Sequence, residues 1–170
     1  MARKPRTWLE VVGEVARYLG AVSLLMVAAI HAQQYYDAYF SVVPTIGRLF
    51  MLNIVGGSVT GLLLLAPVRL LGRRAGDGIL VATALAGIGV AAGAFTALLV
   101  SEYTPLFGFM ESGYRLAIEL SLLFEGLATL LLSAFIAIVA LGRRQASSDA
   151  GAARRQPEHD RRSVGAERTA

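Results

Sequence analysis

The sequence predicts an all-α fold, a four-transmembrane-helix antiparallel bundle with a disordered cytoplasmic C-terminal tail. Three observations lead to this prediction. Hydrophobic residues make up 55% of the 170 residues, which is too apolar for a soluble domain of this size. Four separate stretches are apolar for about 20 residues, the length that a helix needs to cross a bilayer. Basic residues cluster beside these stretches, as they do in membrane proteins.

The apolar stretches define a transmembrane domain over residues 14–142, preceded by a short cytoplasmic segment, 1–13. They run approximately over 14–35, 49–71, 78–101 and 114–141. The first is longer than the apolar core of a signal peptide and is followed by an aromatic, polar segment without a small-residue cleavage site. We therefore expect it to be a membrane helix.

The distribution of Lys and Arg predicts the orientation in the plasma membrane. Basic residues gather at the amino-terminal end, between the second and third stretches, and after the fourth; they are Arg3, Lys4, Arg6, Arg17, Arg69, Arg73, Arg74, Arg143 and Arg144. The other two connections contain only Arg48 and Arg115. By the positive-inside rule, this multi-pass protein has both termini in the cytoplasm.

Composition also predicts a tail and excludes several classes of function. Residues 143–170 contain almost no large apolar side chain, so we expect a disordered basic tail. The chain has no cysteine, which excludes thiolate metal sites and cysteine nucleophiles. The basic clusters do not form one face with interleaved aromatics, so no nucleic-acid partner is expected. No phosphate-binding loop, serine elbow or metal-ligand spacing is present, and we expect no enzyme and no metal.

The two outer connections are rich in aromatic residues. Residues 33–48 contain three tyrosines and Phe40, and residues 102–113 contain Phe107 and Phe109. Aromatic rings favour the headgroup layer of a bilayer. Both connections are therefore predicted to lie at the outer interface, where together they could form a lid.

Small residues at four-residue spacing indicate close helix packing. Gly57 and Gly61 lie on the second predicted helix, and Gly89 and Gly93 on the third. In lipid, such positions let two backbones approach each other. The simplest interpretation is a tight hairpin between these two helices, and contact with another copy or a larger membrane complex is the alternative.

Polar residues on several helices fall in one layer of the predicted membrane. Counting from the cytoplasmic helix ends places His31 at about 20 Å, Asn53 at about 22 Å and Glu125 at about 24 Å. Gln34 and Thr96 come out slightly higher, and Glu119 lies near the outer boundary. Because ionisable groups are costly in hydrocarbon, this layer is a candidate polar cluster, His31, Gln34, Asn53, Thr96, Glu119 and Glu125.

The cluster has two interpretations. Buried polar groups often serve only to hydrogen-bond neighbouring helices and fix their register. Alternatively, the layer binds a small ligand, an ion or a proton shared between His31 and Glu125. No cofactor is expected, because haem b usually takes two axial ligands and this domain holds one histidine.

The segment Val43-Pro44-Thr45-Ile46-Gly47-Arg48-Leu49-Phe50-Met51-Leu52-Asn53 carries a resemblance. Together with His31 and with Phe107-Gly108-Phe109-Met110-Glu111, it resembles small uncharacterised four-helix integral membrane proteins of actinobacterial type. The resemblance covers about residues 14–142. It implies the four-helix architecture and supplies no activity.

Three functions are compatible with these features. The first is a non-enzymatic accessory or binding subunit that associates with a larger membrane complex or with its own copies. The second is a small proton-coupled transporter that uses the polar cluster, and the third is a redox accessory that holds haem or quinone at His31.

Overall fold

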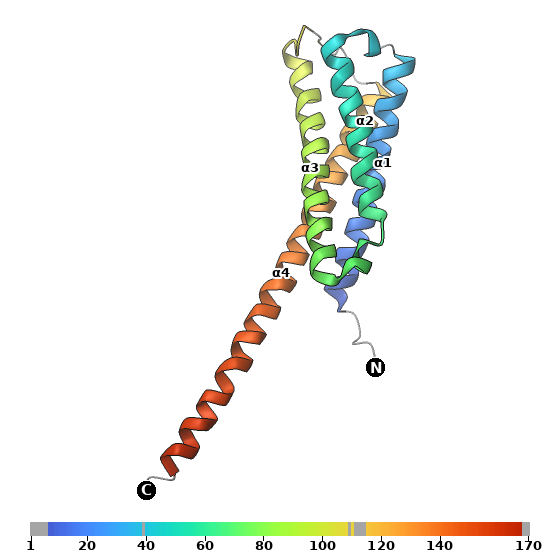
Figure 1. The fold of residues 1–170 in the computed structure, drawn as a ribbon. Coiled ribbons are helices and arrows are strands. Elements are labelled where there is room, and N and C mark those ends of the chain that lie inside the picture. The colour runs from blue at the N-terminus through green and yellow to red at the C-terminus, as the bar shows by residue number, and fades with distance from the viewer. Residues whose placement is uncertain (1–6, 39, 109, 111–114, 168–170) are drawn as a thin grey trace. The chain divides into compact units, whose positions relative to one another are not determined.

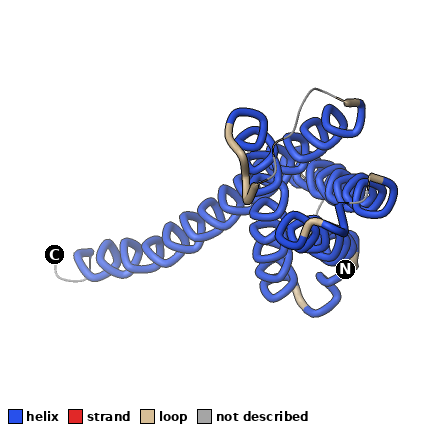
Figure 2. Tube along the Cα trace, turned by 90° about the horizontal axis from the view of Figure 1, so that it is seen from above, coloured by secondary structure: helices blue, strands red, loops and turns tan. Residues whose placement is uncertain are grey.

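Long helices account for almost all of the structure, a computed structural model that describes residues 7–38, 40–108, 110 and 115–167 (Figures 1 and 2). The side chains of residues 73 and 149–167 lie outside this description. The elements are α1 (Trp8–Asp37), η1 (Phe40–Val42), α2 (Pro44–Leu65), η2 (Val68–Leu71), α3 (Arg73–Tyr103) and α4 (Leu116–Glu167). The predicted all-α class is confirmed, and the described residues contain no β-strand.

Local signals, not hydropathy, decide where the helices begin. α1 begins at Trp8, ahead of its predicted span, because Thr7 and Glu10 form a capping box in which each side chain accepts a hydrogen bond from the other's backbone N–H. α2 begins at Pro44, whose fixed φ suits the first helical position. Pro67 follows the end of α2, and Gly72, with φ 105°, separates η2 from α3.

The chain divides into two compact units, Met1–Ile136 and Ala137–Ala170. The first contains α1, α2, α3 and the beginning of α4. The second continues as helix to Glu167, where composition predicts a disordered tail. Its Ala, Arg, Gln and Glu residues have high helix propensity, and extending an existing helix avoids the cost of nucleation.

Gly57 and Gly61 bring α2 against α1, and not against α3 as their spacing suggested, whereas a Cβ added at Gly56 of α2 would lie 2.9 Å from Val90 of α3. A Cβ added at Gly57 would lie 2.9 Å from the carbonyl oxygen of Leu24, and one at Gly61 would lie 3.1 Å from that of Ala21. Both contacts are with α1. Gly89 and Gly93 are exposed and have no atom within 4 Å of an added Cβ among the described residues.

Two glycines that the spacing did not single out lie at the centre of the first unit. A Cβ at Gly20 would lie 2.7 Å from Leu132, and one at Gly87 would lie 2.7 Å from Leu24. Both leucine side chains are fully buried. α1, α3 and α4 therefore meet around Leu24 and Leu132, and a side chain larger than glycine at either position would require these buried leucines to move.

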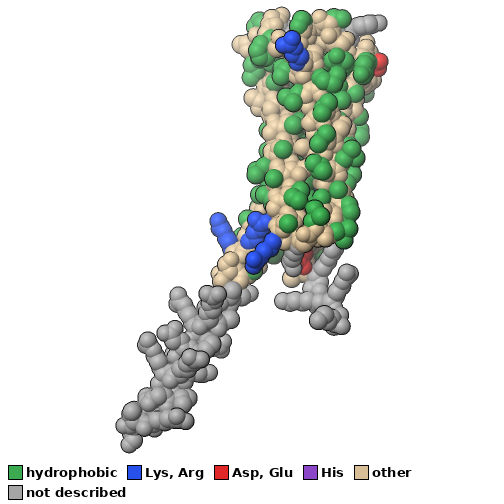
Figure 3. All heavy atoms as spheres, viewed as in Figure 1, with side chains coloured by type: hydrophobic (Ala, Val, Ile, Leu, Met, Phe, Trp, Pro, Cys, Tyr) green, Lys and Arg blue, Asp and Glu red, His purple; other side chains and the backbone are tan. Residues whose placement is uncertain are grey.

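The outward faces of the helices are apolar (Figure 3). On α2, Leu52, Val55, Val59 and Leu62 are each at least half exposed and recur at helical spacing. All four long helices contain a segment long and apolar enough to cross a membrane. The last of these segments runs over Leu116–Ser148.

Candidate functional site

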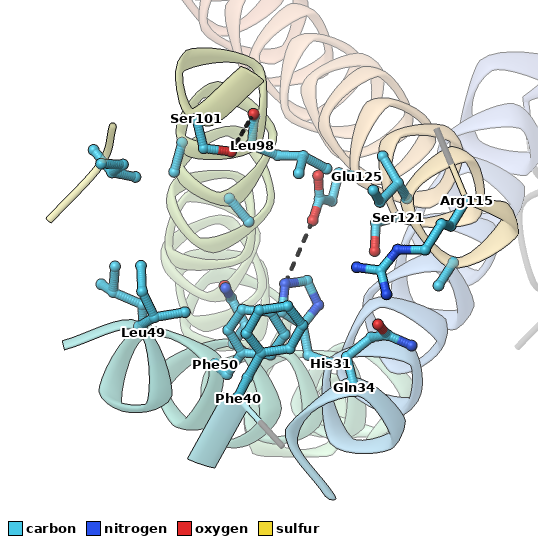
Figure 4. A pocket seen from close by; sticks show the side chains of 17 residues that line it. His31, Gln34, Phe40, Leu49, Phe50, Leu98, Ser101, Arg115, Ser121 and Glu125 are labelled. Atoms are coloured by element: carbon cyan, nitrogen blue, oxygen red, sulfur yellow. Dashed lines mark hydrogen bonds and ion pairs between the residues drawn. The ribbon is translucent and has the colours of Figure 1, made fainter. Parts of the chain in front are cut away.

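A cavity of about 100 Å³ lies between the four helices of the first unit, toward the end of α1 and the beginning of α2 (Figure 4). Its walls combine apolar side chains with a few polar ones. The polar side chains are those of His31, Gln34, Asn53, Ser101, Arg115, Ser121 and Glu125. A cavity of this volume has room for several water molecules or one small ligand.

His31 and Glu125 face each other inside this cavity (Figure 4). Nε2 of His31 lies 3.8 Å from Oε1 of Glu125, which is within ion-pair distance but too long for a hydrogen bond. Glu125 is 1% exposed, and neither of its carboxyl oxygens has a hydrogen-bond partner in the described part of the chain. Ser121 lines the same cavity one turn earlier, yet it does not satisfy this carboxyl group.

The backbone of α1 determines the tautomer of His31. Nδ1 of His31 lies 2.9 Å from the carbonyl oxygen of Val27. Because a carbonyl oxygen can only accept, Nδ1 carries a hydrogen and donates it. In a neutral imidazole, Nε2 then has a lone pair directed at Glu125. If Glu125 were ionised, two hydrogen-bond acceptors would face each other with no hydrogen between them. A single additional proton, on Glu125 or on Nε2, gives the pair one hydrogen-bond donor and one acceptor that face each other.

Two phenylalanines continue the site on one side of His31. The ring of Phe50 lies 5.0 Å from that of His31 and is tilted by 55°, and Phe40 stacks on Phe50 at 4.8 Å. Offset and tilted ring pairs of this kind are favourable beyond the area they bury. The two phenylalanine rings hold His31 in place and give the cavity an aromatic wall.

The structure brings four of the six predicted cluster residues to one cavity and leaves two outside. His31, Gln34, Asn53 and Glu125 line it. Thr96 is exposed and donates to the carbonyl of Ala92 on its own helix, and Glu119 is exposed near the start of α4.

Helix rotation explains which residues were placed correctly and which were missed. On α3, the lining residues are Ala94, Ala97, Leu98 and Ser101, which share a face that excludes Thr96 at about 100° per residue. On α2, Phe50 lies one turn before Asn53 and therefore on the same helix face. Helical periodicity counted from Asn53 would have predicted that Phe50 lines the cavity. Arg115 also lines the cavity and was missed as a site residue, because in the sequence it indicated only the orientation of the chain in the membrane.

A second polar cluster lies near the other end of α1 and includes basic residues that in the sequence indicate only the orientation of the chain. Arg69 of η2 pairs with Glu14 of α1, and its Nε lies 2.8 Å from Oδ1 of Asp77 of α3. Arg17, 4% exposed, pairs with Glu14 at 2.9 Å. Burial alone would lower the pKa of Arg69, but the carboxylates of Asp77 and Glu14 outweigh it and raise this pKa. Arg69 therefore joins α1, η2 and α3 as a permanent cation.

The residues at His31 do not fit a haem group. Nδ1 is engaged by Val27, and the Glu125 carboxyl group, 3.8 Å from Nε2, leaves no room for a porphyrin at that nitrogen. The cavity is also smaller than the roughly 300–1,000 Å³ of pockets that enclose drug-sized ligands. The predicted lid, formed by the connections 33–48 and 102–113 together, is only partly described: Phe107 is 64% exposed, and Phe109 lies outside the described residues.

Comparisons with protein families, with curated proteins and with solved structures found no match. The resemblance noted in the sequence therefore stays an expectation, and the cavity is the feature that bears on function.

Proposed function

We propose that this chain is a multi-pass plasma-membrane protein in which the four helices cross the bilayer antiparallel to one another and both termini lie in the cytoplasm. The exposed apolar faces support this proposal, because Val15, Leu19 and Val22 on α1 repeat the pattern of α2. Such faces are costly in water and normal in lipid. The clustering of Arg69 and Arg74 between α2 and α3 supports the orientation.

Within that architecture, the chain acts as a non-enzymatic binding protein whose site is a proton-holding pair, His31 and Glu125. One observation carries this proposal: Glu125 is 1% exposed, and both carboxyl oxygens lack hydrogen-bond partners in the described residues, beside Nε2 of His31. A carboxyl group that only fixed helix register would be hydrogen-bonded to a neighbouring helix. An ionisable group left unsatisfied in the membrane instead marks a functional site.

The test counts the protons on the pair. Nitrogen NMR of the histidines reports which imidazole nitrogens are protonated, and the infrared carbonyl stretch reports whether Glu125 is protonated. At neutral pH we expect a single proton on Glu125 or on Nε2 of His31, in addition to the one on Nδ1. Glu125→Gln should remove this proton, whereas Glu119→Gln, which changes an exposed carboxylate on the same helix, should leave it unchanged.

The proposal fails if Glu125 is ionised while Nε2 of His31 is unprotonated in the wild type at neutral pH. The pair would then hold no shared proton. His159→Gln removes the other histidine and assigns the nitrogen signals.

A second candidate function is association with a larger membrane complex through α3. It is favoured by Gly89 and Gly93, which are exposed and have no neighbour from this chain's described residues near an added Cβ. Gly89→Leu should abolish co-purification of such a complex without unfolding the chain. Gly57→Leu is unsuitable for this test because Gly57 packs on α1. Retention of the complex by Gly89→Leu would contradict the proposal.

A further inference from the structure

We propose that the cavity binds a small cation with N–H donors, of the ammonium or primary-amine class, in exchange for the proton held by His31 and Glu125. This inference rests on the proposed function, because it requires that the pair hold a proton. It adds the chemical class of the ligand and the coupling of its binding to proton release.

Three acceptor atoms of the His31 and Glu125 pair have no hydrogen-bond donor in the described residues. The Glu125 carboxyl group has two oxygens that lack hydrogen-bond partners in the described chain, and Nε2 of His31 has a lone pair because Nδ1 carries the hydrogen. The hydroxyl of Ser121 and the amide of Asn53 add further oxygen acceptors to the wall. A ligand with several N–H groups supplies what these atoms lack.

Both the type and the arrangement of these groups favour a nitrogen cation over a metal ion. Hard metal cations prefer a shell of oxygen ligands, and the described residues hold no group of three or more His, Cys, Asp or Glu side chains that could bind one. An imidazole lone pair and the rings of Phe40 and Phe50 are instead suited to an N–H donor and to cation–π contact. The cavity volume of about 100 Å³ limits the ligand to a small one.

Charge balance makes the binding an exchange. The charged and titratable groups that line the cavity are His31 from α1, Glu125 from α4 and Arg115, which immediately precedes α4, while the described lining residues of α2 and α3 are uncharged. With one proton in addition to the one on Nδ1, the His31 and Glu125 pair has no net charge. A cation that entered without removing this proton would leave a net positive charge in a low-dielectric environment, which is costly.

The exchange conserves both atoms and charge. The O–H bond of Glu125, or the Nε2–H bond of His31, breaks and its proton goes to water. The ammonium group then lies against the carboxylate and donates to Nε2 of the neutral imidazole. Arg115 is exposed at the start of α4, where water screens its positive charge.

The experiment measures the binding of methylammonium to the full chain in lipid nanodiscs by calorimetry, in buffers of different ionisation enthalpy and at several pH values. We expect one proton released for each cation bound. The apparent Kd should fall about tenfold for each unit rise in pH while the pair holds its proton. Sodium and potassium at equal ionic strength, and tetramethylammonium, which has no N–H group, should not compete.

Variants test whether the ligand occupies this cavity. Glu125→Gln should weaken methylammonium binding by more than about a hundredfold, because the bound cation loses its counter-charge. Glu119→Gln should leave the Kd unchanged, and the melting temperatures of both variants verify that they are folded.

Three results would overturn the inference: no methylammonium binding, binding without proton release, or equal competition by tetramethylammonium. The NMR and infrared count of protons on His31 and Glu125 does not depend on the binding experiment. If that count still finds the shared proton, the proposed proton-holding pair stands and only the cation exchange is rejected.

Discussion

Glu125 is a residue at which fold stability and a binding role have opposite requirements. Its carboxyl group is buried in the core of the four helices and lacks hydrogen-bond partners in the part of the chain that the structure describes. Burial of a polar group without such a partner costs about 1–3 kcal/mol in proteins. If Glu125 contributed to packing, replacing it would destabilise the fold. If it serves binding, replacing it with an apolar residue should stabilise the fold.

We therefore predict that Glu125→Leu raises the free energy of unfolding by about 1–3 kcal/mol, because an apolar side chain of similar size removes the unsatisfied group. Reversible unfolding in mixed detergent micelles measures this change. Glu119→Leu replaces an exposed carboxylate on the same helix and should change the stability much less. A loss of stability in Glu125→Leu would favour the helix-packing interpretation of the cluster.

At the scale of the elements, glycines determine which helix faces meet. Spacing alone identified Gly57, Gly61, Gly89 and Gly93 as equivalent small-residue positions. Among the described residues, only the first two have close neighbours at an added Cβ, and these neighbours belong to α1. The reason is that spacing along one helix defines a face but does not name the partner of that face.

Two alanine substitutions compare these positions directly. In Gly57→Ala, the new Cβ lies 2.9 Å from the carbonyl oxygen of Leu24, a backbone atom that cannot rotate away, and we expect a loss of about 1–3 kcal/mol. In Gly89→Ala, no described atom lies within 4 Å, and the helix propensity of alanine should add up to about 1 kcal/mol. Unfolding in detergent measures both, and equal effects would contradict the assigned α1–α2 contact.

The connection between α2 and α3 is held by Arg69, which pairs with Glu14 and Asp77. Ion pairs of partly exposed residues contribute about 0.2–1 kcal/mol each, so Arg69→Gln should lower the free energy of unfolding by about 1 kcal/mol. High salt should reduce the difference from the wild type. Arg74→Gln is the matched control, because it removes one positive charge from the same connection at an exposed position. An equal loss in both variants would mean that total charge, and not this network, is responsible.

At the scale of the whole molecule, the absence of cysteine allows a direct test of orientation. In a membrane with both termini in the cytoplasm, Ser41→Cys lies outside the cell and Leu70→Cys lies inside. A membrane-impermeant maleimide should label the first in intact cells and the second only after permeabilisation. Leu24→Cys, at a fully buried position, is the unlabelled control. Labelling of Leu70→Cys in intact cells would reverse the proposed orientation.

The sequence by itself determined the all-α class and the four long apolar helices, because a period of 3.6 residues and a length of about 20 apolar residues are properties of the chain alone. It also placed His31, Asn53 and Glu125 at one depth, since the rise per residue converts position into height. It did not determine helix rotation. That rotation directs Thr96 and Glu119 outward and brings Phe50 beside His31.

Only the tertiary structure decided which groups meet. Gly57 faces α1 because the backbones of the two helices approach each other closely there. The carboxyl group of Glu125 faces Nε2 of His31 because packing around Leu24 and Leu132 sets the rotation of α1 and α4. These contacts join residues far apart in the sequence, and their geometry depends on the shapes of many side chains at once. The depth of a residue along its helix follows from its position in the sequence. The direction in which its side chain points toward a neighbouring helix does not.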